Sequence, residues 1–312
     1  MHNTITLIEI TLQARQTVAW PHFAGSTLRG AFGRALRGAA CITGQTQCNG
    51  CALRASCAYG EVFDPAPPVN PLHPSFNDGL PRYLVQPPAL GACQLNMGQT
   101  QSFTLLLMPG TQAHHPLIEH ILRATVEKEL IRPGTFSLTK TRISHQTVIN
   151  PQITAAKTPQ TESQDPAQVT LRWLTPLRIQ QKGKPIFRPE MLDATTLVRA
   201  LLRRQLQWQQ MTQHLQPTEN TPQLPDSQAL RHAADQCTLD TRNLQWHDIQ
   251  RHSSTQNQKL PLGGLIGSTQ LHGPAHALHQ LYGLLQLGEQ IHIGKETVMG
   301  LGHYQLSPIQ TG

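Results

Sequence analysis

Four cysteines lie close together in the first part of the chain, at a spacing that could bind a metal ion. Six, two and five residues separate Cys41, Cys48, Cys51 and Cys57. Four thiolates that include one close pair are typical of a tetrahedral zinc site and could also hold an iron–sulfur cluster. A redox dithiol needs only two cysteines in a thioredoxin-like context, which is missing here. We therefore expect a structural metal site, with zinc favoured over a cluster and four free thiols as the alternative.

An arginine-rich helix is predicted immediately before these cysteines. The stretch "GSTLRGAFGRALRG", residues 25–38, has Ser26 as a candidate N-cap and Gly38 as a candidate end. At about 100° per residue its apolar side chains fall in one sector, and its arginines fall in the opposite one. These arginines are Arg29, Arg34 and Arg37. A cationic face of this kind is either solvated or placed against phosphate groups.

Glycines surround a single lysine in the last part of the sequence. The residues concerned are Gly288, Gly294, Lys295, Gly300 and Gly302. Glycines allow close approach of the backbone to an anion, and the lysine adds charge. The spacing excludes a P-loop, because five residues separate the first two glycines and Glu296 stands where a magnesium-binding Ser or Thr is required. A glycine-rich turn between strands is the alternative.

Composition and charge narrow the class of partner. The 312 residues include 25 Lys and Arg against 18 Asp and Glu, a formal net charge of +7. This excess favours a polyanionic partner. Glu9 interrupts the apolar run that a signal peptide would need, and no window approaches the roughly 20 apolar residues of a membrane span. We expect a cytoplasmic protein with no membrane partner.

The order of expected elements indicates two α+β units. Strands are expected over 5–17, 102–110, 134–148, 169–180, 241–252, 262–273 and 290–294, and helices over 25–38, 116–130, 190–208 and 276–288. Two strand–helix–strand–strand–helix–strand units are typical of tandem ferredoxin-like domains. We place the first at 1–150 with a cysteine-bearing insert over 41–62, a linker at 151–167, and the second, with the glycine-rich loop, at 168–312.

Both ends of the sequence resemble a known family. The stretch "FAGSTLRGAFGRALRGAAC" near the start and "LIGSTQLHG" followed by "GKETVMGLGHYQL" near the end resemble the paired motifs of CRISPR precursor-RNA processing endoribonucleases of the RAMP superfamily. The middle fragments "LRWLTPLRIQ" and "LVRALLRRQ" also fit, so the likeness covers most of the chain.

The resemblance implies a fold and a reaction. It implies tandem ferredoxin-like domains of the RRM or RAMP type, which bind a CRISPR repeat hairpin and cut it without a catalytic metal. The RNA's own 2′-hydroxyl would be the nucleophile, leaving a 2′,3′-cyclic phosphate and a 5′-hydroxyl. Other CRISPR effector subunits are implied as further partners.

Roles for individual residues follow from the same resemblance. Arg29 and Arg34 would stabilise charge at the scissile phosphate, and His22 in "WPHF" is the nearest candidate base. Many relatives carry a histidine on or just after this helix, and here that region has none. The candidate RNA contacts are Arg37, Arg199, Arg203, Gly294, Lys295, Gly300, Gly302 and His303. Arg199, Arg203 and Arg204 are expected to lie off the apolar stripe of their helix, where phosphate contact and solubility are both open.

Two other functions stay open. A non-cleaving RAMP subunit could bind guide RNA within an effector complex, and a cysteine-based metal or redox protein would use the four thiols for its own chemistry. Cleavage of repeat RNA in EDTA separates the first from an endoribonuclease, and metal content tests the second.

Overall fold

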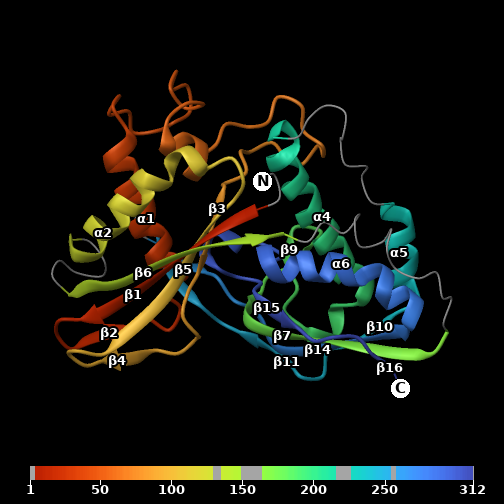
Figure 1. Cartoon of the computed structure of the whole chain (residues 1–312). Helices are drawn as coiled ribbons and strands as arrows, with labels where there is room; N and C mark the ends of the chain where they lie inside the picture. The colour runs from red at the N-terminus through yellow and green to blue at the C-terminus, as the bar shows by residue number, and fades with distance from the viewer. Residues whose placement is uncertain (1–3, 129–134, 149–163, 216–225, 254–257, 312) are drawn as a thin grey trace. The chain divides into compact units, whose positions relative to one another are not determined.

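The computed structural model describes residues 4–128, 135–148, 164–215, 226–253 and 258–311 (Figure 1). The chain forms two compact units, Met1–Thr147 with Leu206–Pro217, and Val148–Gln205 with Thr218–Gly312. Most of the linker expected over 151–167 lies outside the described residues, and strand β7 already begins at Pro166. A search of the described helices finds none with the length and apolar character needed to cross a membrane.

The first unit is a four-stranded antiparallel sheet with two helices. Its strands lie in the order β3-β5-β1-β6, so that the second, third, first and fourth strands of the unit are neighbours. This is the ferredoxin-like order. The elements are β1 (Thr4–Ala14), α1 (Gly25–Ala40), β3 (Tyr83–Gln86), β5 (Thr100–Leu107), α2 (His115–Lys128) and β6 (Phe136–Thr147), with a short β2 (Val18–Trp20) and β4 (Cys93–Leu95) pair, a one-turn π-helix η1 (Tyr59–Phe63) and a 3-10 turn η2 (Gln112–His114).

Side-chain alternation explains these elements. Ile8, Ile10 and Leu12 of β1 are buried, whereas Glu9 between them is exposed. On α1 the residues that share the buried face include Leu28 and Phe32, at the spacing of one helical turn. Figure 1 shows α1 and α2 side by side over the sheet of this unit.

The second unit repeats the architecture. Its sheet has the order β10-β14-β7-β15, again antiparallel and again second, third, first and fourth. The main elements are β7 (Pro166–Leu177), α4 (Ala194–Thr212), α5 (Ser227–Asp235), β10 (Thr238–Asp240), β11 (Leu244–His247), β14 (Gly264–Pro274), α6 (Ala275–Ile291) and β15 (Tyr304–Leu306). Short elements are β8 (Gln180–Gln181), β9 (Lys184–Pro185), η3 (Pro189–Met191), β12 (Gln250–Ser253), β13 (Gln258–Pro261), η6 (Thr297–Met299) and β16 (Gln310–Thr311). The end of α4 from Leu206 and the following η4 (Gln213–Leu215) belong to the first unit.

The core of this unit lies between the sheet and its helices. Leu171 and Trp173 of β7, Leu201 of α4, and Leu281 and Leu285 of α6 are almost fully buried in one cluster. Two ferredoxin-like units with helices and antiparallel sheets confirm the α+β fold that the sequence predicts.

Several predicted details are wrong. Helix α1 begins at Gly25 with Ala24 at the N-cap position, so Ser26 is inside the helix and does not cap it. The helix continues past Gly38, and the Cys41 amide still donates to the Arg37 carbonyl. The closing strand expected over 290–294 is instead β15, since the apolar pattern of α6 carries the helix to Ile291. The sequence reading also missed β3, β10 and α5.

Candidate functional site

Two of the three α1 arginines lie over aromatic rings. The guanidinium carbon of Arg29 is 4.9 Å from the ring centroid of Phe63, and that of Arg37 is 5.5 Å from the ring centroid of Tyr59. Both arginine side chains are half-buried, whereas Arg34 is exposed. The predicted cationic face therefore exists, but Arg29 does not point away from the packed side of the helix. It lies at the edge of that side, which corrects the expectation.

The rings beneath these arginines form a continuous stack. Tyr59 and Phe63 stack at 5.0 Å, Phe63 and Tyr83 stack at 5.0 Å, and Phe32 meets Tyr83 edge-on at 5.2 Å. A Cβ atom at Gly33 would lie 2.4 Å from the Phe63 ring, so glycine is required for this close approach. The stack docks the segment after the cysteines onto α1 and orients the two guanidinium groups.

Nearby carboxylates are already paired with other cations. Asp64 accepts a hydrogen bond from Arg54 at 2.9 Å, and Glu61 lies 2.6 Å from His114. Helix α1 itself contains no acidic residue. The Nε atom of Arg29 is buried and has no hydrogen-bond partner among the described residues. The arginine face of α1 therefore carries oriented positive charge, and no carboxylate on α1 neutralises it. Oriented guanidinium groups of this kind can bind a phosphate group.

The candidate base His22 lies in the loop between β2 and α1. Its side chain is exposed, and its carbonyl accepts a hydrogen bond from the Gly91 amide at 3.0 Å. Position 22 is three residues before the start of α1, the helix that carries Arg29 and Arg34. Its role as a base stays a prediction.

The four clustered cysteines do not form one ligand set. The Thr43 hydroxyl lies 3.7 Å from the Cys41 sulfur and 3.9 Å from the Cys51 sulfur, while Cys57 accepts a hydrogen bond from the Gly60 amide at 3.2 Å. Within the described part of the chain, no three His, Cys, Asp or Glu side chains are placed to hold a metal ion. As folded here, the thiols do not fit a tetrahedral site, and binding would require them to move together.

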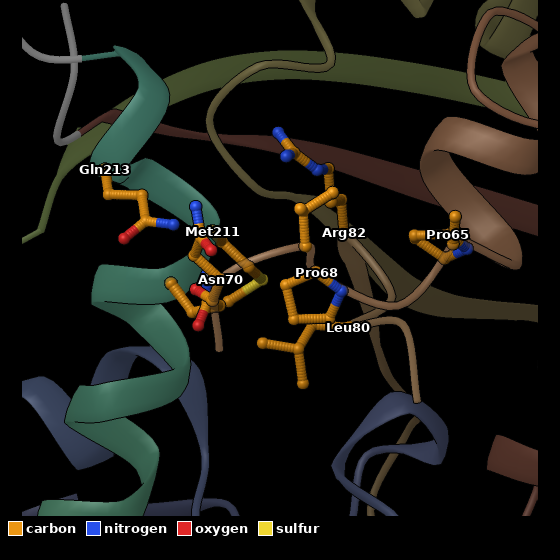
Figure 2. A pocket seen from close by; sticks show the side chains of 10 residues that line it. Pro65, Pro68, Asn70, Leu80, Arg82, Met211 and Gln213 are labelled. Atoms are coloured by element: carbon orange, nitrogen blue, oxygen red, sulfur yellow. Dashed lines mark hydrogen bonds between the residues drawn. The ribbon is translucent and has the colours of Figure 1, made fainter. Parts of the chain in front are cut away.

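A cavity of about 290 Å³ lies in the first unit between the proline-rich segment and the end of α4 (Figure 2). Gln210 accepts a hydrogen bond from the Leu72 amide at 2.6 Å and donates to the Asn70 carbonyl at 3.4 Å. Arg82 donates to the Pro109 carbonyl at 3.1 Å, and burial lowers its pKa. These polar groups hold the surrounding loops, so we assign the cavity a packing role.

In the second unit the glycine-rich loop packs against the end of β7. The Gly302 amide donates to the Pro176 carbonyl, the Gly300 amide to the Thr297 carbonyl, and the Lys295 amide to the Arg178 carbonyl. Gly300 and Gly302 are buried, whereas Lys295 is exposed.

Two glycines of this loop have no room for a side chain. A Cβ at Gly302 would lie 1.8 Å from the Ile293 carbonyl oxygen, and one at Gly294 would lie 2.5 Å from the Arg178 carbonyl oxygen. Their left-handed φ values, 71° and 89°, require glycine as well. Direct RNA contact by these glycines stays a prediction, and their geometry favours packing.

His303 lies at the end of the same loop. Its ring stacks on the buried His292 ring at 4.5 Å, and burial lowers the His303 pKa to about 4. The ring is therefore neutral near pH 7, and any RNA contact by His303 would be made by an uncharged imidazole.

The arginines of α4 differ from one another. Arg199 is exposed and Arg203 is half-buried. Arg204, expected off the apolar stripe, is instead buried, and it donates to the Ile291 carbonyl at 2.8 and 2.9 Å and to the His292 carbonyl at 3.1 Å. It satisfies carbonyls at the C-terminal end of α6, where a cation is favoured. Burial lowers the Arg204 pKa to about 10.

Two protein-family models match the sequence. Residues 3–166 match a family model named AF_1859_N and described as an N-terminal domain, and residues 171–304 match the model described as CRISPR-associated endoribonuclease Cas6. Residues 171–304 therefore belong to the Cas6 family. No curated protein matches the sequence.

Solved structures share its fold at low sequence identity. The Cas6 (TTHB231) product complex is 15% identical with a TM-score of 0.59, and the match covers 98% of this chain and 100% of that one. Thermus thermophilus Cas6 (TTHB231) is 17% identical with a TM-score of 0.53, over 97% and 98% of the two chains. A partial Cas6-RT-Cas1–Cas2 complex is 14% identical with a TM-score of 0.59, over 97% of this chain. The chain spans only 46% of the length of that relative.

The sequence patterns did not predict two features of the site, the aromatic stack and the burial of Arg204. The aromatic stack was signalled only by Tyr59 and Phe63, one helical turn apart just after Cys57. The burial of Arg204 was signalled by its register, because it lies seven residues after Leu197 and four before Trp208. That spacing places it on the buried stripe of α4.

Proposed function

We propose that this chain is an endoribonuclease that recognises the CRISPR repeat hairpin and cuts precursor RNA to give mature guide RNA. The RNA's 2′-hydroxyl attacks the adjacent phosphate, and the products are a 2′,3′-cyclic phosphate and a 5′-hydroxyl. The observation that carries the proposal is the cationic face of α1 on a chain whose residues 171–304 match the Cas6 family model. The likeness in fold to a structure described as a Cas6 product complex adds support.

The chemistry assigns roles to the first unit. Arg29 and Arg34 stabilise charge as it develops on the phosphate, and Arg37 contacts the neighbouring backbone. The aromatic stack fixes Arg29 and Arg37 before substrate arrives, which lowers the entropy cost of alignment. His22 is the candidate base for the 2′-hydroxyl proton. Because the arginines supply the positive charge, we propose that no catalytic metal is needed.

Residues of the second unit are proposed to contact the RNA as well. The proposed phosphate contacts in this unit are Lys295, Arg199 and Arg203. The first two side chains are exposed and that of Arg203 is half-buried. Gly294, Gly300, Gly302 and His303 are proposed to shape the loop that presents Lys295.

The experiment is cleavage of a repeat-containing RNA by purified protein in EDTA. We expect one discrete cut per repeat and a 3′ fragment that carries a 5′-hydroxyl. A strict requirement for magnesium would contradict the proposal. In the same assay His22→Ala should slow cleavage by roughly 100-fold if His22 is the base, and by a few-fold if substrate alignment by arginine dominates.

A second candidate is a non-cleaving RAMP subunit that holds guide RNA. One observation favours it, since no histidine occurs between Phe23 and Thr46, the region where many relatives carry one. Tight binding of repeat RNA without any cut in EDTA or in magnesium would support this candidate over the endoribonuclease.

A further inference from the structure

A basic hairpin projects from the second unit between β7 and α4. Strands β8 and β9 pair across a tight turn, in which Lys182 has a φ of 50° and Gly183 a φ of 79°. Lys182 and Lys184 are exposed at this turn, and Arg188 is exposed just after it. The sequence over 178–189 contains four cationic residues and no acidic one. This segment is therefore a local concentration of positive charge.

An aromatic pair lies beside the hairpin. Phe187 is 53% exposed, and its ring centroid is 4.6 Å from that of Trp246 on β11, with the planes tilted by 56°. The other three tryptophans, Trp20, Trp173 and Trp208, are each at most 5% exposed. Phe187 and Trp246 thus form an aromatic surface that reaches solvent.

Both rings are held on well-packed backbone. Ile186, next to Phe187, is only 2% exposed, and its amide donates to the Ile179 carbonyl at 3.0 Å. Trp246 packs against the core of the unit, and its Nε1–H donates to Asp248 at 2.7 Å. A large apolar ring held rigidly in solvent loses little entropy when it binds a flat partner.

We propose that Phe187 and Trp246 form a stacking platform for an unpaired RNA nucleotide, with Lys182, Lys184 and Arg188 on the adjacent phosphates. This rests on the proposed function, and it adds a site for single-stranded RNA flanking the repeat hairpin. Aromatic rings stack on exposed base faces, whereas bases inside a duplex are already stacked on both sides. The exposed cations of the segment 178–189, which contains no acidic residue, favour a polyanion, while the nearby Asp248 accepts the Trp246 Nε1–H.

Binding of two RNAs tests the platform. One RNA is the repeat hairpin with single-stranded flanks, and the other is the same hairpin without them. Phe187→Ala should weaken binding of the flanked RNA roughly tenfold, since base–aromatic stacking contributes about 1–3 kcal/mol. Binding of the bare hairpin should be unchanged within about twofold. Phe187→Tyr keeps a ring at this position and should retain most of the affinity.

Salt dependence and fluorescence give independent readouts. Lys184→Gln should lower the salt slope of flanked-RNA affinity by about one. The matched control is Arg242→Gln, which removes one positive charge as Lys184→Gln does. Arg242 is exposed, lies outside the proposed platform, and pairs with Asp240 at 2.6 Å. Flanked RNA should also quench tryptophan fluorescence, and Trp246→Phe should abolish most of that quenching.

Three results would overturn the inference. Equal losses on both RNAs for Phe187→Ala would show a general effect on the fold or on hairpin binding. Unchanged affinity for the flanked RNA, in a protein that still cuts repeat RNA, would remove the platform and leave the proposed function standing. A wild-type protein that binds neither RNA would overturn both proposals together.

Discussion

Helices α1 and α4, the first helix of each unit, each carry three arginines, but the arginines of the two helices contact different kinds of group. On α1, the guanidinium groups of Arg29 and Arg37 lie over aromatic rings, and Arg34 is exposed. On α4, Arg204 is buried against the carbonyl end of α6, and Arg199 is exposed. Both helices follow the first strand of a ferredoxin-like unit, so the difference comes from the neighbours of each helix.

The neighbours differ because different segments of the chain pack against the arginines of the two helices. In the first unit, residues 41–82 follow α1 and bring Tyr59 and Phe63 onto its cationic face. In the second unit, the C-terminal end of α6 lies against α4, and its Ile291 and His292 carbonyls accept hydrogen bonds from Arg204. Arg29 and Arg37 of α1 are thereby held over aromatic rings, whereas Arg204 of α4 stabilises the C-terminal end of α6.

Removal of Arg204 should have the largest effect on stability. Arg204→Ala leaves the Ile291 and His292 carbonyls without this donor and opens a cavity in a buried place. We expect a loss of about 3 kcal/mol or more in the free energy of unfolding. Urea denaturation measures it, with Arg199→Ala as the control, which should stay within about 0.5 kcal/mol. Equal stability of the two variants would break the comparison.

Removal of Arg29 should instead act on the reaction. Arg29→Ala should slow single-turnover cleavage roughly 100-fold and change RNA affinity far less, since the contact strengthens in the transition state. Arg29→Lys keeps the charge but loses the planar contact with Phe63, and should recover only part of the rate. The control is Arg242→Ala, which removes an exposed arginine that pairs with Asp240 and has no proposed RNA contact. Equal loss of rate in Arg29→Ala and Arg242→Ala would contradict a specific role for the α1 arginines.

The smallest effect should come from the cysteine insert. If zinc draws the four thiols together, Cys51→Ser should remove the bound zinc and lower the melting temperature by a few degrees. The exposed Cys93, outside the cluster, offers Cys93→Ser as the matched control. Wild-type protein that carries no metal after gentle purification would contradict the zinc prediction and leave four structural thiols.

The hydrophobic periodicity of the sequence predicted the strands and helices whose burial follows from local sequence. The alternation in β1 and the apolar stripe of α1, together with the same kinds of pattern over 169–180 and 190–208, predicted two α+β units of the ferredoxin-like type. The same periodicity could have placed Arg204, which shares the register of Leu197 and Leu201, but its charge suggested a surface position. A helical wheel identifies the packed side of a helix and does not identify what covers the other side.

Long-range contacts account for the remaining errors. The stack of Phe63 on Tyr83 joins residues separated by the proline-rich segment, and no local pattern reports that contact. The closing strand was misplaced because the β-rich "QIHIG" resembles a strand, whereas β15 is fixed by its pairing with Trp173 and Leu171 of β7. Pairing partners of short strands are set by the assembled sheet.

A single 2′-deoxy substitution immediately upstream of the cut tests the central claim most directly. The measurement is single-turnover cleavage of substituted and unmodified repeat RNA in EDTA, together with the affinity of each RNA. Attack by the 2′-hydroxyl predicts no detectable cleavage of the substituted RNA and nearly unchanged binding, because the removed group reacts but contributes little affinity. Cleavage of the substituted RNA at the normal rate would contradict the account.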